Sequence, residues 1–269
     1  MAQPAAIRKS PKHDNIKRRL LRRLLGKERF MQHRNFLVLD GIDGCGKSTI
    51  LQFFGQEFEN RGKTSFNVAE HIKTTRTFPR YEDLPPADVL LSAEPTHVWT
   101  GAAIRGEIIS NKAEYSAMET AQLFAIDRHM LYNRIILPAL SAGKIVLQDR
   151  SFLTTLVYQP VQGGITEKEI LALPGNVLAD ANCPQAFIQV ECPVDIALER
   201  LHKRSGKKDD SIFERAETLE KLRNAFMSSW FLEYLNHKGI KRMVLPNNEE
   251  LDRTRLAVAK LIQKFFPNL

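Results

Sequence analysis

Short apolar runs alternate with longer amphipathic segments along the chain from residue 35 onward. The apolar runs have the length of buried strands, and the longer segments have the 3.6-residue periodicity of helices. The expected strands are 36–39, 88–93, 144–148, 186–190 and 242–245. The expected helices are 47–60, 114–142 with a bend at Pro138, 194–203, 214–236 and 250–265. This alternation predicts a three-layer α/β domain, in which helices flank a mainly parallel sheet of about five strands.

Two segments lie outside this alternation. Residues 63–87 are polar and contain prolines, so they form a long excursion in which we expect one short strand. Residues 1–34 form an N-terminal arm that should contain a short basic amphipathic helix. Its apolar positions at helical spacing are Ile16, Leu20, Leu21, Leu24 and Leu25. The predicted division is therefore an arm over 1–34 and an α/β domain over 35–269.

Positive charge is concentrated in the arm. The chain carries +8 at pH 7, but 11 Lys and Arg against two acidic residues give residues 1–34 a charge of +9 and leave −1 for the rest. The nearly neutral domain gives no reason to expect specific nucleic-acid binding. The arm suits contact with an anionic surface, such as a membrane or an anionic polymer, or organelle import. The alternative is that its leucines pack on the domain.

The cysteines indicate the compartment. Cys45, Cys183 and Cys192 are few and scattered, which argues against a disulfide framework and favours a reducing environment. Charges interrupt every apolar stretch, so we expect no membrane span. We therefore expect a cytoplasmic protein, with organelle targeting by the arm as the alternative.

A phosphate-binding loop follows the first expected strand. Residues 41–48 read GIDGCGKS, a complete GxxxxGKS motif between a strand and a helix. The glycines let the backbone approach phosphates, Lys47 can reach the β- and γ-phosphates, and Ser48 can bind Mg²⁺. The predicted nucleotide-binding residues are Gly41, Ile42, Asp43, Gly44, Cys45, Gly46, Lys47, Ser48 and Thr49. This motif predicts a P-loop NTPase fold that binds ATP or GTP.

Two further sites are candidates for binding the phosphate acceptor. Asp149 and Arg150 directly follow an expected strand, where ligands bind in parallel sheets, so Asp149 could hold Mg²⁺ and Arg150 a phosphate. The alternative is an exposed ion pair at the strand end. Phe124 and Arg128 share one helix face, where a ring and a guanidinium suit a nucleobase. The alternative is that Phe124 belongs to the core and Arg128 to solvent.

A basic loop follows the helix 194–203. It could close over ATP and neutralise charge during phosphoryl transfer, or it could be a solvated turn. Its cationic residues are Lys203, Arg204, Lys207 and Lys208.

These motifs together resemble the thymidylate kinase family. The resemblance runs from about residue 35 to the C-terminus through FLVLDGIDGCGKST, SAEPTHVWTGAAIRGEI, AQLFAIDRHMLYNRIILPAL, IVLQDRSFLTTLVYQ and QAFIQVECPVDIALERL. It implies ATP-dependent, Mg²⁺-assisted conversion of dTMP to dTDP for dTTP synthesis, by enzymes that are usually homodimers. It also implies that Phe124 stacks on thymine and Arg128 contacts its O4 carbonyl. Thr155 and Gln159 would face the base, and Tyr158 would lie under the sugar.

The resemblance also implies roles in catalysis. Arg150 would bind the acceptor phosphate, and Asp43 would organise the transferring phosphoryl group. Since the phosphate loop carries no arginine, the basic loop should supply that charge. The predicted catalytic residues are Asp43, Lys47, Glu94 and Arg150. The predicted acceptor-binding residues are Glu94, Arg105, Phe124, Arg128, Arg150, Thr155, Tyr158 and Gln159, and the predicted metal ligands are Ser48 and Asp149.

Several positions depart from the family pattern. Ala93 stands where many members have an arginine before Glu-Pro, so either one phosphate contact is missing or Arg105 or Arg80 supplies it. Ser151 stands where the family usually has an aromatic residue or histidine. The arm and the excursion 63–87 are additions.

Two alternative functions remain. A related deoxynucleoside kinase would use Glu94 as base for a 5′-hydroxyl, and Trp99, Arg150 and Ser151 resemble features of that family. LFAIDR and TTLVYQ fit the monophosphate kinase better. The other alternative is a kinase-like body that presents the arm to a partner, against which the intact Lys47 argues.

Overall fold

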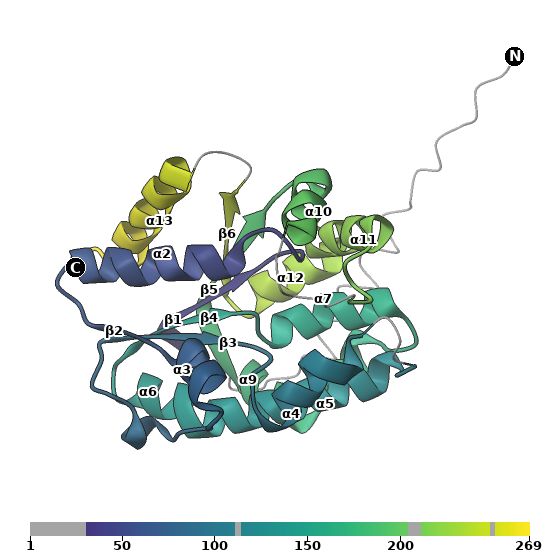
Figure 1. The fold of residues 1–269 in the computed structure, drawn as a ribbon, viewed down its shortest axis with the longest axis horizontal. Helices are drawn as coiled ribbons and strands as arrows, with labels where there is room; N and C mark the ends of the chain where they lie inside the picture. Colours follow the sequence, from purple (N-terminus) through teal and green to yellow (C-terminus); the bar gives the residue numbers. More distant parts are fainter. Residues whose placement is uncertain (1–30, 111–113, 204–210, 248–250) are drawn as a thin grey trace, which may run out of the picture.

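The computed structural model describes residues 31–110, 114–203, 211–247 and 251–269. Its described residues form one parallel sheet of six strands in the order β2-β3-β4-β1-β5-β6 (Figure 1). The strands are β1 (Met31–Asp40), β2 (Ser65–Asn67), β3 (Val89–Ala93), β4 (Ile145–Asp149), β5 (Asn182–Glu191) and β6 (Lys241–Pro246). Central strands buried on both faces explain the continuous apolar runs of the sequence.

Helices cover both faces of the sheet. Helices α2 and α13 pack together on one face, and α5 and α6 lie on the other (Figure 1). The longer helices are α2 (Lys47–Asn60), α3 (Val68–Thr75), α5 (Ala117–Leu131), α7 (Phe152–Gln162), α9 (Pro174–Ala181), α10 (Val194–His202), α11 (Ala216–Phe226), α12 (Ser229–His237) and α13 (Leu251–Phe265). The short ones are α4 (Trp99–Ala103), α6 (Leu137–Ser141), α8 (Glu167–Leu171), η1 (Tyr81–Asp83), η2 (Ile104–Ile108) and η3 (Tyr132–Ile136). The predicted three-layer α/β fold is confirmed.

The sheet differs from the prediction at two places. The short strand expected in the excursion is β2, which pairs with β3 at the sheet edge and makes six strands rather than about five. Strand β1 begins at Met31 rather than at residue 36, because Met31–His33 pair with the start of β5 before a register shift ahead of Leu37. The predicted amphipathic helix of the arm lies outside the described residues. None of the described helices is long and apolar enough to cross a membrane.

Two long predicted helices are interrupted. The segment 114–142 contains α5, the π-helical turn η3 and α6, and η3 ends two residues before Pro138, which lies in the first turn of α6. Proline lacks a donor N–H, which favours such a change in hydrogen bonding. The segment 214–236 is two helices, because the chain turns at Met227 and the Ser228 side chain accepts from the Phe231 N–H to begin α12.

Helices α7, α8 and α9 were not predicted. Every residue of α7 from Phe152 to Gln159 is buried, so this helix shows no amphipathic period. Its local signal was the Ser151 cap, which accepts a hydrogen bond from Leu153 N–H. Helix α8 carries a capping box between Thr166 and Glu169, a recognisable start signal.

Candidate active site

Parallel pairing brings three separate segments to one edge of the sheet. Leu39 of β1 and Ala93 of β3 both lie in register with Asp149 of β4. The phosphate loop, the 94–99 loop and Arg150 therefore all follow carboxyl ends of neighbouring strands, where ligands bind in such sheets. A cavity of about 560 Å³ opens there. Predicted residues from all three segments line it, together with Phe124, Thr155, Tyr158 and Gln159 from the helices.

The phosphate loop is tightly packed. A Cβ at Gly44 would lie 2.3 Å from the Ala197 carbonyl oxygen, and Gly46 has φ 92°, a conformation that side chains disfavour. Asn247 Nδ2 donates to the Cys45 carbonyl at 2.7 Å, a contact that sequence reasoning missed because 202 residues separate the partners. Lys47 Nζ donates to the Gly41 and Ile42 carbonyls at 3.0 and 2.9 Å. The ammonium group is therefore held inside the loop that would surround a phosphate.

The residues predicted to hold Mg²⁺ lie together. Ser48 Oγ donates to Asp149 Oδ2 at 3.3 Å. The other carboxylate oxygen, Asp149 Oδ1, is buried and has no hydrogen-bond partner among the described residues. An unsatisfied buried carboxylate oxygen beside a hydroxyl is a donor set that fits Mg²⁺, which retains water and substrate oxygens as its other ligands. Within the described ranges, no group of three or more His, Cys, Asp or Glu could hold a metal.

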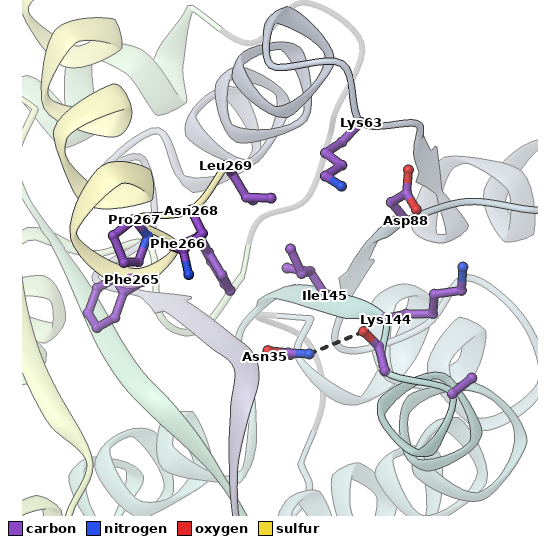
Figure 2. A pocket seen from close by; sticks show the side chains of 12 residues that line it. Asn35, Lys63, Asp88, Lys144, Ile145, Phe265, Phe266, Pro267, Asn268 and Leu269 are labelled. Carbon is purple, nitrogen blue, oxygen red and sulfur yellow. Dashed lines mark hydrogen bonds between the residues drawn. The ribbon is translucent and has the colours of Figure 1, made fainter.

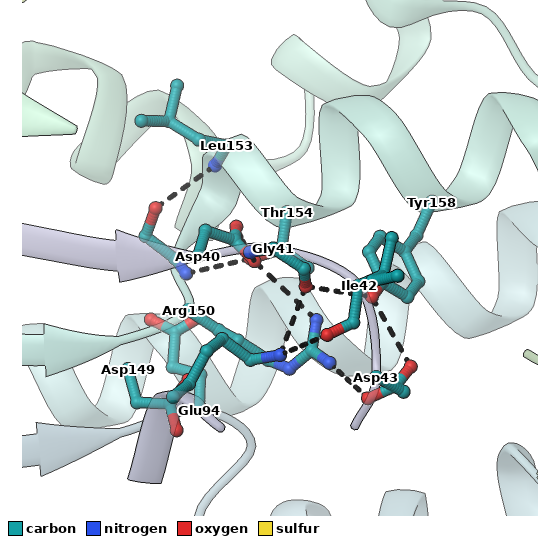
Figure 3. A network of polar contacts seen from close by, with 12 residues as sticks. Asp40, Gly41, Ile42, Asp43, Glu94, Asp149, Arg150, Leu153, Thr154 and Tyr158 are labelled. Atoms are coloured by element: carbon teal, nitrogen blue, oxygen red, sulfur yellow. Dashed lines mark hydrogen bonds and ion pairs between the residues drawn. The ribbon is translucent and has the colours of Figure 1, made fainter. Parts of the chain in front are cut away.

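Arg150 is the centre of a network of polar contacts (Figure 3). Its Nη2 donates to Asp43 Oδ1, its Nη1 lies 3.7 Å from Asp40 Oδ1, and its guanidinium carbon is 4.8 Å from the Tyr158 ring centroid. The single O–H of Tyr158 is shared between the Gly41 carbonyl at 3.2 Å and Asp43 Oδ2 at 3.3 Å. Burial raises the pKa of Tyr158 well above its usual value, so the hydroxyl stays a donor. The alternative of an exposed strand-end ion pair is wrong, since the Arg150 side chain is only 14% exposed.

Asp40 links this network to the phosphate loop and to helix α7. Its Oδ2 accepts from Thr154 Oγ1 at 2.5 Å and its Oδ1 from Gly41 N–H at 2.8 Å. Burial raises the pKa of Asp40, while the Arg150 and Lys47 cations oppose that change. Sequence reasoning missed Asp40 and Thr154 because neither belongs to the phosphate-loop motif. They fix the orientation of Arg150 relative to the loop.

Glu94 and Arg128 form a buried ion pair at the start of the 94–99 loop. Arg128 Nε and Nη2 donate to Glu94 Oε2 at 2.9 and 2.6 Å, and Gln148 Nε2 donates to Glu94 Oε1 at 2.8 Å. Arg128 also donates to Asn176 Oδ1, and to Thr155 Oγ1 at 3.2 Å. The alternative that Arg128 is solvated is wrong, because it is 1% exposed. Its guanidinium is held by protein groups in this structure.

The remaining predicted residues are placed as follows. Phe124 is half-buried and lines the cavity, so the alternative that it belongs to the core is wrong. Arg105 also lines the cavity, and its Nε donates to the Pro95 and Thr96 carbonyls at 3.0 and 3.1 Å. In the described chain, Arg80 is exposed at the start of η1 and is not among the cavity residues.

The basic loop lies mostly outside the described residues. Arg204, Lys207 and Lys208 belong to the undescribed segment 204–210. Lys203 is exposed and forms an ion pair with Glu199 one turn earlier in α10. Ser211, Phe213 and Glu214, which follow the basic loop, line the cavity. The chain therefore returns to the site directly after this loop.

A second cavity lies at the opposite edge of the sheet (Figure 2). It has a volume of about 420 Å³ and is lined by Lys63, Asp88 and Lys144, which precede three strands, and by the C-terminal residues. None of the predicted site residues lies there. Lys63 therefore lies away from the predicted sites of both the donor phosphate and the acceptor phosphate.

Glu94 should make folding stability depend on pH. Burial raises the pKa of Glu94 from 4.5 to about 7, although Arg128 opposes this. The folded protein therefore keeps this proton to higher pH than the unfolded chain, and Glu94 reduces stability as pH rises from 4.5 to 7. Glu94→Gln does not titrate, so its stability relative to wild type should rise over this range, by on the order of 3 kcal/mol. Urea unfolding at pH 5, 6, 7 and 8 measures this. A relative stability that is constant or falls would mean that the ion pair with Arg128 determines the charge state.

Gly101 should be required because the 94–99 loop packs directly against it. Thr96 donates from N and Oγ1 to Asp127 at 2.7 and 2.6 Å, and a Cβ at Gly101 would lie 2.3 Å from Thr96 Oγ1 and 2.5 Å from its carbonyl oxygen. We expect Gly101→Ala to destabilise the protein by about 1–3 kcal/mol. Gly106→Ala is the control, because its Cβ would meet nothing within 4 Å. Thermal unfolding of the two variants tests this, and equal melting temperatures would contradict it.

Comparisons with known proteins show the family of this chain. The family model described as thymidylate kinase matches residues 73–234, more than half of the chain. This range contains Glu94, Arg128 and Arg150 but begins after the phosphate loop. A thymidylate kinase of Desulfotalea psychrophila is 30% identical over 201 residues, 75% of this chain and 84% of that protein. A probable thymidylate kinase of Thermococcus kodakarensis is 32% identical (66% and 77% covered), and one of Pyrococcus horikoshii is 35% identical (63% and 70%). The chain belongs to the thymidylate kinase family.

Proposed function

We propose that this protein transfers the γ-phosphoryl group of ATP to dTMP and produces ADP and dTDP. The observation that supports this best is the shared cavity, which is lined by phosphate-loop residues and by Arg150, Phe124 and Gln159. A donor phosphate at the loop and an acceptor phosphate at Arg150 would then meet in one cavity. Positioning and charge neutralisation are the main sources of catalysis in such reactions.

In this reaction an oxygen of the acceptor phosphate bonds to the γ-phosphorus. The bond from that phosphorus to the β–γ bridging oxygen breaks, and the electron pair leaves with ADP. Lys47 would stabilise charge on the β- and γ-phosphates, and Arg150 would hold the acceptor phosphate beside Asp43. Mg²⁺, held through Ser48 and Asp149, would neutralise further phosphate charge when bound. The acceptor phosphate is already ionised, so no residue has to remove a proton from it.

This chemistry leaves Glu94 without a role as base. Its carboxylate is bound by Arg128 and Gln148, and these contacts support the wall that would face the thymine ring. No specific observation favours the deoxynucleoside kinase alternative. Arg128 would act on thymine from this buried position, with Phe124 stacked on the ring and Gln159 facing its edge.

The test is ADP release from MgATP with either dTMP or thymidine as acceptor. We expect turnover with dTMP and at most background turnover with thymidine. Turnover with thymidine alone would assign the protein to hydroxyl phosphorylation and make Glu94 the base. Other deoxynucleoside monophosphates measure the selectivity for thymine.

The arm, the assembly and the compartment are separate proposals. We propose that the protein is a homodimer, which sedimentation would test, and that it is cytoplasmic, in accord with three buried free cysteines.

We propose further that the basic arm contacts an anionic surface. Removal of residues 1–30 should then weaken retention on anionic vesicles and leave turnover unchanged. Reduced turnover would show that the arm supports the domain instead.

A further inference from the structure

The excursion supplies part of the wall of the active-site cavity. Helix α3 buries Val68 and Ile72 and packs beside β3. Its other side contributes Ala69, Glu70 and Lys73 to the cavity that contains Arg150. Helix α3 of the excursion therefore reaches the cavity that phosphate-loop residues and Arg150 also line.

Helix α3 is also tied to the loop that follows β3. The helix ends at Thr75, and the next residue, Arg76, has φ 56° and donates from Nη1 to the His97 carbonyl at 3.2 Å. Arg105 holds the same loop at the Pro95 and Thr96 carbonyls. These contacts fix α3 relative to the loop that would hold the acceptor.

Positive charge gathers at this part of the wall. Burial lowers the pKa of His97 to about 4, and the Arg105, Lys73 and Arg76 cations lower it further, against the opposing effect of Glu70. The imidazole is therefore neutral at pH 7. Lys73 and Arg105 line the cavity together with His97, and cations in a cavity attract a doubly charged anion.

We propose that Lys73, on helix α3 of the excursion, binds the acceptor phosphate together with Arg105. This rests on the proposed function, and Lys73 and Arg105 would then supply the phosphate contact for which many members of the family have an arginine where this chain has Ala93. Lys73 Nζ lies 3.0 Å from Glu70 Oε2, but both side chains are about half exposed. An exposed pair of this kind is weak, so the ammonium group can exchange the carboxylate for a phosphate dianion.

The test compares dTMP with thymidine, which differ only in the phosphate. Calorimetry gives the Kd of each for wild type, Lys73→Ala, Lys73→Arg and the control Lys63→Ala, whose lysine lies in the cavity at the opposite edge of the sheet. We expect Lys73→Ala to weaken dTMP binding by about 10- to 100-fold. Its thymidine affinity and its KM for ATP should not change. Lys73→Arg should restore most of the dTMP affinity, and Lys63→Ala should equal wild type.

Two results would overturn the proposal. Unchanged dTMP affinity in Lys73→Ala would show that the lysine does not touch the phosphate. Equal losses of dTMP and thymidine affinity would show that Lys73 supports the wall without binding the phosphate. The proposed function fails separately, through absence of dTMP turnover by wild type, whereas direct binding tests Lys73 whether or not turnover occurs.

Discussion

Replacing Lys47 with alanine should lower kcat for dTMP phosphorylation by about 10³-fold while the protein remains folded. The lysine ammonium lies inside the phosphate loop, within 3.0 Å of two of its carbonyl oxygens. A cation placed there would act on the β- and γ-phosphates, where negative charge increases as the γ-phosphoryl group leaves ATP. Removing one such preorganised group typically costs 10²–10³ in kcat.

The fold should tolerate this substitution. The Gly41 carbonyl would still accept from the Tyr158 hydroxyl, so mainly the Ile42 carbonyl loses a partner, at a cost of about 1 kcal/mol. Steady-state kinetics with saturating MgATP and dTMP give kcat, and urea unfolding gives stability. Lys63→Ala is the matched control for removing a lysine. A kcat within tenfold of wild type would contradict the phosphate-loop mechanism.

Local motifs made the donor half of the site predictable from sequence. The residues from Gly41 to Ser48 are neighbours in the chain, so their spacing alone fixes how a strand–loop–helix unit presents them. The acceptor half depends on contacts between distant positions. Arg150 meets Asp43 across 107 residues, and Arg128 meets Asn176 across 48. Residue type and spacing gave no indication of these partners.

The same distinction explains the errors in the fold. Strands buried on both faces can be recognised as apolar runs, and their alternation with helices predicts a parallel sheet, but not the order of the strands in it. Helix α7 is equally buried on all sides, so its pattern matched no period. The role of the excursion was not predictable either. Helix α3 directly follows β2, whose pairing with β3 joins positions 24 residues apart and covers only three residues, so the local pattern did not show where α3 would lie.

Replacing Arg150 with alanine should lower kcat/KM for dTMP by about 10²–10³-fold, mainly through KM. The guanidinium would bind the acceptor phosphate, so its loss removes binding to dTMP without removing a contact to ATP. Thymidine affinity should change little, because the nucleoside carries no phosphate. Kinetics with dTMP at saturating ATP, together with thymidine binding, measure this difference.

Arg150 also has a structural role, which the experiment must separate. It is the cation beside Asp43 and Asp40, and Asp40 is fully buried. Breaking a buried ion pair by removing one partner commonly costs 3–5 kcal/mol, so Arg150→Ala should also be less stable by up to about that amount. Burial already raises the pKa of Asp40, so this carboxyl group can be protonated as pH falls. The stability that Arg150→Ala loses relative to wild type should therefore be smaller at lower pH.

Arg150→Lys separates the two roles. A lysine retains the positive charge near Asp40 but cannot form the two-pronged contact that a guanidinium makes with a phosphate. This variant should recover most of the stability and only part of the dTMP affinity. If Arg150→Lys instead restored the dTMP KM fully, charge alone would suffice at this position. If Arg150→Ala kept a normal KM for dTMP while losing stability, Arg150 would be a structural residue, and Lys73 and Arg105 would be the remaining candidates for the acceptor phosphate.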